Sequence, residues 1–194
     1  DQALDGLVLE LPEPGALKLT VMAPDGSPAS GAAVFVRDAS GRTLEPFSMQ
    51  TTGPDGELLV KSLAPGDYTV LTRTKDLCSP ESAAVRVRAN EVTELRLDLG
   101  VGTIVKVQLQ SKESREPVRG SVRVLDAADR DYANLFGYQD LQYLYIEGGF
   151  SPTEHRFGPL PPGRYTVHGQ AGDQSAKKPV TLKGGERRVV MRLK

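Results

Sequence analysis

The chain has 194 residues, of which 39% are hydrophobic and 25% charged, and its formal net charge is −1. This composition excludes a disordered tail, and the lack of any run of about 18 apolar residues predicts that no segment spans a membrane. The balanced charge gives no electrostatic attraction to nucleic acid or to an anionic membrane, and the single cysteine, Cys78, excludes an internal disulfide.

Residues 1–14 form a leading segment. Gly6 to Leu11 has the apolar character of a strand, but nothing before it could pair with it. The chain opens on Asp1 without the basic and apolar regions of a signal peptide. We therefore expect a mature or truncated fragment of a longer protein, with this segment supplying the last strand of a preceding domain.

Residues 15–99 are predicted to form a first β-sandwich. Leu17, Leu19 and Val21 recur at every second position, which is the period of a strand with one buried face. Turns rich in Pro, Gly and Asp lie at 24–26, 53–56 and 64–66. They separate further short apolar strands, which we place at 31–36, 57–63, 68–71, 85–87 and 95–99.

Residues 100–194 are predicted to repeat this order as a second β-sandwich. Val105, Val107 and Leu109 match the first strand, and the stretch LPPGRYTV at 160–167 matches LAPGDYTV at 63–70. Both stretches have the form L-x-P-G-x-Y-T-V. Matching anchors in one order indicate an internal duplication, and with it an all-β chain of two tandem seven-stranded sandwiches.

An insertion distinguishes the second copy. The offset between matching glycines is 89 residues at Gly31 and Gly120 but 97 at Gly66 and Gly163. We assign the difference to residues 126–156. The link between the copies, Gly100-Val101-Gly102, is very short, so we expect the pair to behave as a semi-rigid rod.

Three motifs of the first copy carry a family resemblance: DGSPASGAAV at 25–34, TGPDGEL at 52–58 and LAPGDY at 63–68. Together they resemble the carboxypeptidase regulatory-like domain, which is related to Cna protein B-type surface repeats. The resemblance covers about residues 15–194, although the second copy lacks the Asp-Gly turn. It implies a transthyretin-like (prealbumin-like), Ig-like sandwich in an exported setting: periplasmic, cell-surface or secreted.

The tyrosine of each signature, Tyr68 or Tyr165, is interpreted as a folding residue. Pro-Gly makes a tight reversal, and the ring two positions later enters the next strand. A buried tyrosine ring contributes a large apolar area while its hydroxyl reaches a backbone group. This role requires no ligand.

The residue types that carry catalysis are sparse and unconnected. Cys78, His155 and His168 are flanked by no nucleophile or metal-binding motif, so we predict no enzyme, no cofactor and no metal site. Asp25 and Asp55 lie on turns, but calcium requires six to eight oxygen ligands. An isopeptide cross-link from Lys18, known in some related repeats, is rejected because the last strand of the first copy contains no Asn.

The insertion concentrates aromatic residues. Six of the chain's eleven aromatics fall within nineteen positions: Tyr132, Phe136, Tyr138, Tyr143, Tyr145 and Phe150. Tyr-rich loops on a rigid sandwich bind protein, peptide or sugar, because tyrosine offers a large contact area at little entropic cost. The alternative is a compact loop that buries its own rings. These six residues are the candidate binding site.

We therefore interpret the chain as a non-catalytic, extracytoplasmic interaction or spacer module of a larger surface, secretion or envelope-associated protein. The alternative is a carbohydrate- or peptide-binding accessory domain of a secreted hydrolase, which a catalytic domain elsewhere in the parent chain would favour. We expect a protein or peptide partner, with carbohydrate as the other class. Nucleic-acid binding and membrane insertion are not expected.

Overall fold

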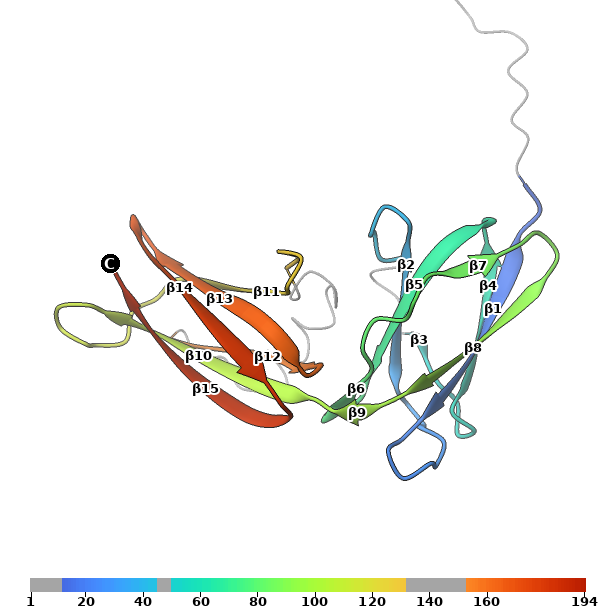
Figure 1. Cartoon of the computed structure of the whole chain (residues 1–194), viewed down its shortest axis with the longest axis horizontal. Helices are drawn as coiled ribbons and strands as arrows, with labels where there is room; N and C mark the ends of the chain where they lie inside the picture. Colours follow the sequence, from blue (N-terminus) through green and yellow to red (C-terminus); the bar gives the residue numbers. More distant parts are fainter. Residues whose placement is uncertain (1–11, 45–49, 132–152) are drawn as a thin grey trace, which may run out of the picture.

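The computed structural model describes residues 12–44, 50–131 and 153–194 as two all-β halves that lie side by side (Figure 1). These described residues form fifteen strands and no helix, which confirms the predicted all-β class. They contain no long apolar helix of the kind that crosses a bilayer. The predicted strand at residues 6–11 lies outside the described residues.

The first sheet of the N-terminal half has the strand order β4-β1-β8. Its strands are β1 (Gly15–Met22), β4 (Glu57–Leu63) and β8 (Val92–Asp98). Strand β1 pairs antiparallel with β4 and parallel with β8. The predicted alternation on β1 is confirmed, because Leu17, Leu19 and Val21 are fully buried and the residues between them only half-buried.

The second sheet of the same half is centred on β2 and β5 and has the order β3-β2-β5-β6-β9, with β7 also paired to β5. Its strands are β2 (Ala33–Asp38), β3 (Gln50–Thr51), β5 (Gly66–Arg73), β6 (Leu77–Cys78), β7 (Val85–Val87) and β9 (Gly100–Val101). The inward side chains of both sheets, among them Val36, Val70 and Val87, form one buried hydrophobic cluster. The half is therefore a two-layer sandwich.

The C-terminal half has the same pattern of pairing. Its first sheet has the order β12-β10-β15, with β10 antiparallel to β12 and parallel to β15. Its second sheet has the order β11-β13-β14. The strands are β10 (Thr103–Ser111), β11 (Ser121–Leu125), β12 (Glu154–Leu160), β13 (Gly163–Ala171), β14 (Gln174–Leu182) and β15 (Gly185–Leu193). Val105, Val107 and Leu109 are fully buried in its core, as their alternation predicts.

The two signature tyrosines occupy equivalent positions in their halves. Tyr68 and Tyr165 are each 6% exposed. The hydroxyl of Tyr68 donates to the carbonyl oxygen of Ala64 at 2.7 Å, and that of Tyr165 donates to Pro161 at 2.9 Å. Each ring therefore holds the turn that precedes its own strand, and the predicted structural role is confirmed.

Replacing Tyr68 or Tyr165 by Phe is expected to lower the free energy of unfolding by about 1 kcal/mol. The ring stays buried while a carbonyl of the preceding turn loses its hydrogen bond. Urea unfolding of each variant beside the wild-type chain measures the loss. Unchanged midpoints in both variants would show that the hydroxyls do not hold the turns.

Candidate functional site

The six aromatic residues predicted to bind a partner all lie in 132–152, outside the described residues. The described chain reaches that segment at Asp131, whose backbone pairs with Leu125, and leaves it at β12. Arg130, next to the first of these points, bonds to Glu81 of the N-terminal half, so the chain reaches this segment at the junction between the halves. The junction and one groove of the C-terminal half are the surfaces from which a site can be built.

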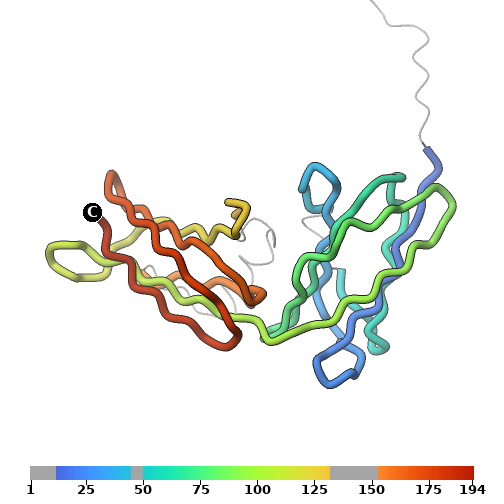
Figure 2. The backbone as a smooth tube through the Cα atoms, viewed as in Figure 1, coloured from blue at the N-terminus to red at the C-terminus, as the bar shows by residue number. Residues whose placement is uncertain are grey.

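The link between the halves is bonded on both sides. Strand β9 pairs with β6, and the Gly102 amide donates to the carbonyl oxygen of Asp76 at 3.1 Å. The Gly102 carbonyl accepts a bond from the Gly185 amide at 2.9 Å. The backbone trace shows this crossing at β9 (Figure 2). A side chain at position 102 would place its Cβ 2.4 Å from Cβ of Pro159, so this crossing requires glycine.

The outer face of β2 and β5 is also buried. A strand with one covered face alternates in exposure, but Val34, Phe35, Val36 and Arg37 are buried in succession. Phe35 and Leu71, at 5% and 1% exposure, belong to the hydrophobic cluster of the C-terminal half. The core of one half therefore continues onto the back of the other.

Arg73 reinforces this contact. Its guanidinium lies 5.5 Å from the centre of the Phe35 ring, within the range of a cation–π interaction. Its Nη1 donates to the carbonyl oxygen of Gly158 at 3.3 Å. The side chain thus joins β5 of the N-terminal half to β12 of the other, 85 residues further along the chain.

A second bridge across the junction is ionic. Glu81 accepts bonds from Arg37 Nη1 at 3.0 Å and Thr69 Oγ1 at 2.7 Å, both in its own half. Its other oxygen accepts a bond from Arg130 Nη1 at 2.6 Å, and Arg130 also pairs with Asp126 at 2.8 Å. Arg130 lies two residues before the undescribed segment. The chain therefore enters the aromatic insertion from a point tied to the N-terminal half.

The charge state of Glu81 follows from these contacts. Burial by itself raises the pKa of this carboxyl. The hydrogen bonds from Thr69 and Arg130 and the positive charges of Arg130 and Arg37 outweigh burial, so the pKa lies below its ordinary value of 4.5. Glu81 is therefore ionised at neutral pH and balances the buried guanidinium of Arg37.

The candidate nucleophile and bases are not brought together. Cys78 lies on β6, His155 on β12 and His168 on β13, which belong to three different sheets. Burial raises the pKa of the Cys78 thiol to about 12, and the charge of Arg73 offsets this only in part. The thiol stays protonated at neutral pH, where the thiolate would be the reactive form.

The acidic turns bond to themselves. Asp25 Oδ1 accepts bonds from the amide and hydroxyl of Ser27 at 3.0 and 2.6 Å, and Asp55 Oδ1 accepts one from the Glu57 amide at 3.0 Å. These are the bonds of ordinary Asx turns. Within residues 12–44, 50–131 and 153–194, no group of three or more His, Cys, Asp or Glu side chains is placed to hold a metal ion.

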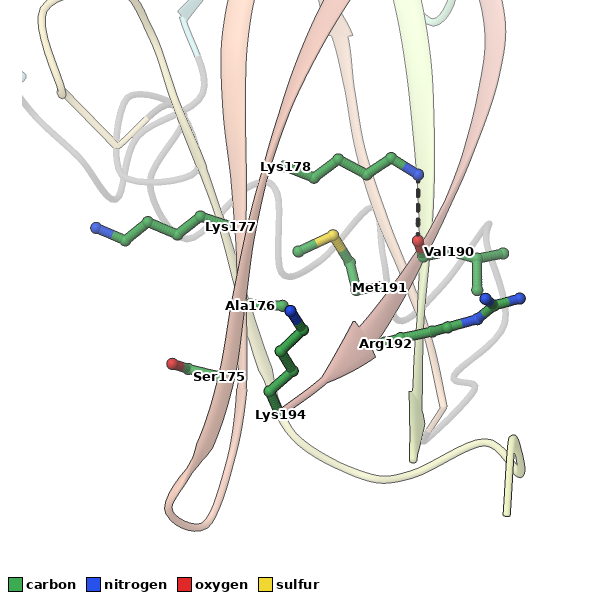
Figure 3. Close-up of a pocket in the computed structure, with 8 residues that line it drawn as sticks. All are labelled: Ser175, Ala176, Lys177, Lys178, Val190, Met191, Arg192 and Lys194. Carbon is green, nitrogen blue, oxygen red and sulfur yellow. Dashed lines mark hydrogen bonds between the residues drawn. The ribbon is translucent and has the colours of Figure 1, made fainter. Parts of the chain in front are cut away.

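A groove of about 760 Å³ opens between β14 and β15, the outermost strands of the two sheets of the C-terminal half (Figure 3). Its apolar lining comes from Ala176, Val190 and Met191, and its charge from four cations: Lys177, Lys178, Arg192 and Lys194. The side chain of Lys178 crosses it and donates to the carbonyl oxygen of Val190 at 3.4 Å. We call this feature the β14–β15 groove.

This groove was not predicted from the sequence, although a signal was present. Residues 174–194 carry seven Lys and Arg side chains against one acidic side chain, Glu186. The balanced net charge of the whole chain hides this local excess. Lys177, Lys178 and Pro179 also follow one another on a single strand, a composition typical of a sheet edge.

Among known proteins, only solved structures show a likeness to this chain. No family model matches the chain, and no curated protein matches it. The Bacillus anthracis TIE protein is 13% identical, with a TM-score of 0.39 over 94% of this chain and 34% of that one. The shaft pilin SpaA from Lactobacillus rhamnosus GG is 8% identical, with a TM-score of 0.37 over 93% of this chain and 98% of the pilin.

GBS52, the minor pilin of Streptococcus agalactiae, is 11% identical, with a TM-score of 0.36 over 92% of this chain and 95% of that one. This chain spans about a third of the TIE chain. At these TM-scores the fold class rests on the strand pairings of this chain itself.

Proposed function

We propose that the chain is a non-catalytic, extracytoplasmic spacer and interaction module of a larger surface, secretion or envelope-associated protein. A spacer must hold two points at a fixed distance and direction, which requires that its units do not swing. The observation that carries the proposal is the bonded link, in which Gly102 donates to Asp76 on one side and accepts from Gly185 on the other. The extracytoplasmic setting is supported by the motifs shared with carboxypeptidase regulatory-like domains.

The units of the spacer are proposed to be two copies of one sandwich, residues 15–99 and 100–194. The corresponding order of pairing supports this division, since β1 and β10 each have one antiparallel and one parallel neighbour. The tyrosine bonds to Ala64 and Pro161 recur at matching positions. The second copy differs by its insertion, residues 126–156.

Substitution of Gly102 by Ala is expected to loosen the two halves. The new Cβ would lie 2.4 Å from Cβ of Pro159 and 2.8 Å from Sγ of Cys78, so the crossing must shift. Gly100→Ala is the matched control, because a Cβ at that position meets nothing within 4 Å. Spin labels introduced by Lys61→Cys and Asp173→Cys, both at exposed positions, report the distance between the halves.

A single narrow distance distribution is expected in the wild-type chain and in Gly100→Ala, and a broader one in Gly102→Ala. Buried Cys78 is not expected to take up label, since its thiol stays protonated and only 2% exposed. A broad distribution in the wild-type chain would mean that the halves swing freely, and the spacer role would then be abandoned.

The contact surface of the module is proposed to be the aromatic insertion. The described residues that flank it support this placement, because Arg130 ties its start to Glu81 at the junction. The triple replacement of Tyr138, Tyr143 and Tyr145 by Ser is expected to abolish capture of a protein or peptide partner while the unfolding midpoint stays unchanged. A glycan array probed with the wild-type chain and with the triple variant shows whether the partner is instead a carbohydrate. Loss of stability without loss of capture would favour a loop that packs on itself.

A further inference from the structure

The β14–β15 groove contains unpaired edges of two strands. At one end of the groove the Ser175 amide donates to the Lys194 carbonyl at 3.2 Å, and the Lys194 amide donates to the Ser175 carbonyl at 3.3 Å. Alternate residues of a strand direct their backbone groups to the same side. Lys177 on β14 and Arg192 on β15 therefore turn their N–H and C=O groups into the groove.

Within the described residues, β14 and β15 belong to different sheets, and no strand ladder joins them. From the end pair the two strands separate, and they come together again at the two-residue link Lys183-Gly184. The Lys178 side chain donates its hydrogen bond across the gap between them. The corresponding strand of the N-terminal half, β7, has three residues where β14 has nine, so the long open edge is a feature of the C-terminal half. Such an edge accepts an added strand.

The charge of the two halves is opposite. Residues 1–99 contain nine Lys and Arg against fifteen Asp and Glu, and residues 100–194 contain fifteen against ten. The formal charges are thus −6 and +5, which add to the net −1 of the chain. Lys177, Lys178, Arg192 and Lys194 place part of the positive excess directly around the groove. An acidic strand is therefore favoured there and a basic one repelled.

The chain carries a segment of matching chemistry. Residues 1–11 contain Asp1, Asp5 and Glu10 and no basic side chain. Leu7, Leu9 and Leu11 recur at every second position, so a strand of this sequence has one apolar face. That face suits the lining of Ala176 and Met191, and Glu10 on the opposite face suits the cationic rim.

Two prolines precede β1. Pro12 and Pro14 have no N–H to donate, so the hydrogen-bonded ladder of that strand does not extend through them. Strand β1 starts at the end of the N-terminal half that is remote from the other half (Figure 1). Because the groove belongs to the opposite half, its occupant is more readily supplied by another copy than by the same chain.

We propose that the β14–β15 groove receives residues 5–11 of a second copy of this chain as an added strand, which links copies head to tail. The inference goes beyond the spacer role, since a rigid spacer needs no open edge. The added strand pairs with the free backbone groups of Lys177 and Arg192. Its leucines cover the apolar lining, and Glu10, on the opposite face, meets the lysines and arginine of the rim.

Sedimentation velocity of the full chain over a range of concentrations tests the link. Reversible association that weakens as salt is added is expected, and a chain that stays monomeric throughout would overturn the proposal. The double variant Lys177→Glu with Arg192→Glu is expected to weaken association roughly tenfold or more, because like charges then face each other. The double variant Lys183→Glu with Arg187→Glu is the matched control, since it makes the same two changes on exposed residues that do not line the groove.

Reversing the charges on both sides of the contact distinguishes this pairing from a general attraction between the acidic half of one copy and the basic half of another. Adding Asp5→Lys and Glu10→Lys to the double variant of Lys177 and Arg192 is expected to restore association. Hydrogen exchange provides the second readout, in which the amides of Lys177 and Arg192 gain protection on association. A peptide of residues 1–12 should compete, and its scrambled form should not. Equal competition by the scrambled peptide, or association without protection of β14 and β15, would overturn the added strand while leaving the spacer proposal intact.

Discussion

Replacing Glu81 by Ala is expected to destabilise the chain by roughly 3–5 kcal/mol, the cost of removing one partner of a buried ion pair. Arg37 would lose the carboxylate at 3.0 Å while its side chain, 10% exposed, stays out of water. Arg130 would lose its bond across the junction. Urea unfolding followed by circular dichroism measures the change.

The matched control for Glu81→Ala is Asp67→Ala. Asp67 pairs with Arg86 at 3.0 Å, but these side chains are 48% and 63% exposed. Exposed pairs contribute about 1 kcal/mol or less, so a small change is expected there. Equal losses in the two variants would mean that burial of the Glu81 cluster has no energetic consequence.

The stability supplied by Glu81 depends on pH in a defined direction. Its folded-state pKa lies below 4.5, so its contribution is fully present above that value and is lost as pH falls through the lowered pKa. The difference in unfolding free energy between the wild-type chain and Glu81→Gln should therefore be constant near neutrality and shrink in acid. Other carboxyls titrate in both proteins and cancel in this difference.

Leu109→Ala is expected to cost about 2–5 kcal/mol, because the side chain is fully buried in the core of the C-terminal half. Its two methyl groups lie over Gly169 of β13, in the other sheet, and over Gly120, which directly precedes β11. A Cβ at Gly169 would lie 2.5 Å from Leu109 Cδ2, and one at Gly120 would lie 2.7 Å from Cδ1. The leucine therefore occupies space that these glycines leave open.

Gly169→Ala should be rescued by shortening Leu109. Alone it overpacks the core, at a cost of about 1–3 kcal/mol. Combined with Leu109→Ala, the new methyl fills part of the cavity, and the double variant should be less destabilised than the sum by about 0.5–3 kcal/mol. A double-mutant cycle from urea unfolding measures this coupling.

Gly120→Ala provides the contrast for that cycle. Its Cβ would also lie 2.2 Å from the carbonyl oxygen of Gln170, which is backbone and does not yield when Leu109 is shortened. We therefore expect Gly120→Ala to stay destabilised in the Leu109→Ala background. Rescue of both glycine variants alike would contradict the packing of Leu109 against these two glycines.

The sequence predicted much of each half because local patterns encode it. Alternation placed Leu17, Leu19 and Val21 on one buried face, and the Pro-Gly turns located the strands that follow them. The roles of Tyr68 and Tyr165 were also predictable, since each hydroxyl bonds four residues back along the chain. The six aromatic residues of the insertion stay a prediction, because they lie outside the described residues.

Contacts between segments that are distant in the sequence could not be predicted from the local residue pattern. The run Ala33-Val34-Phe35-Val36 predicted a strand, yet nothing local showed that both of its faces are covered. The bond from Arg73 to Gly158 joins positions 85 residues apart. The β14–β15 groove likewise depends on how two sheets diverge, which the order of residues along either strand does not reveal.

By itself, the sequence determined the all-β class, the inward faces of the strands and the folding role of the signature, because strand periodicity and turn chemistry act over a few residues. Only the tertiary structure decided how the halves join and which edge stays open. Those features depend on the burial of Phe35 and Leu71 against the other half, on the Glu81 ion pairs and on the end pair of Ser175 and Lys194. Each forms only after the chain has folded back on itself.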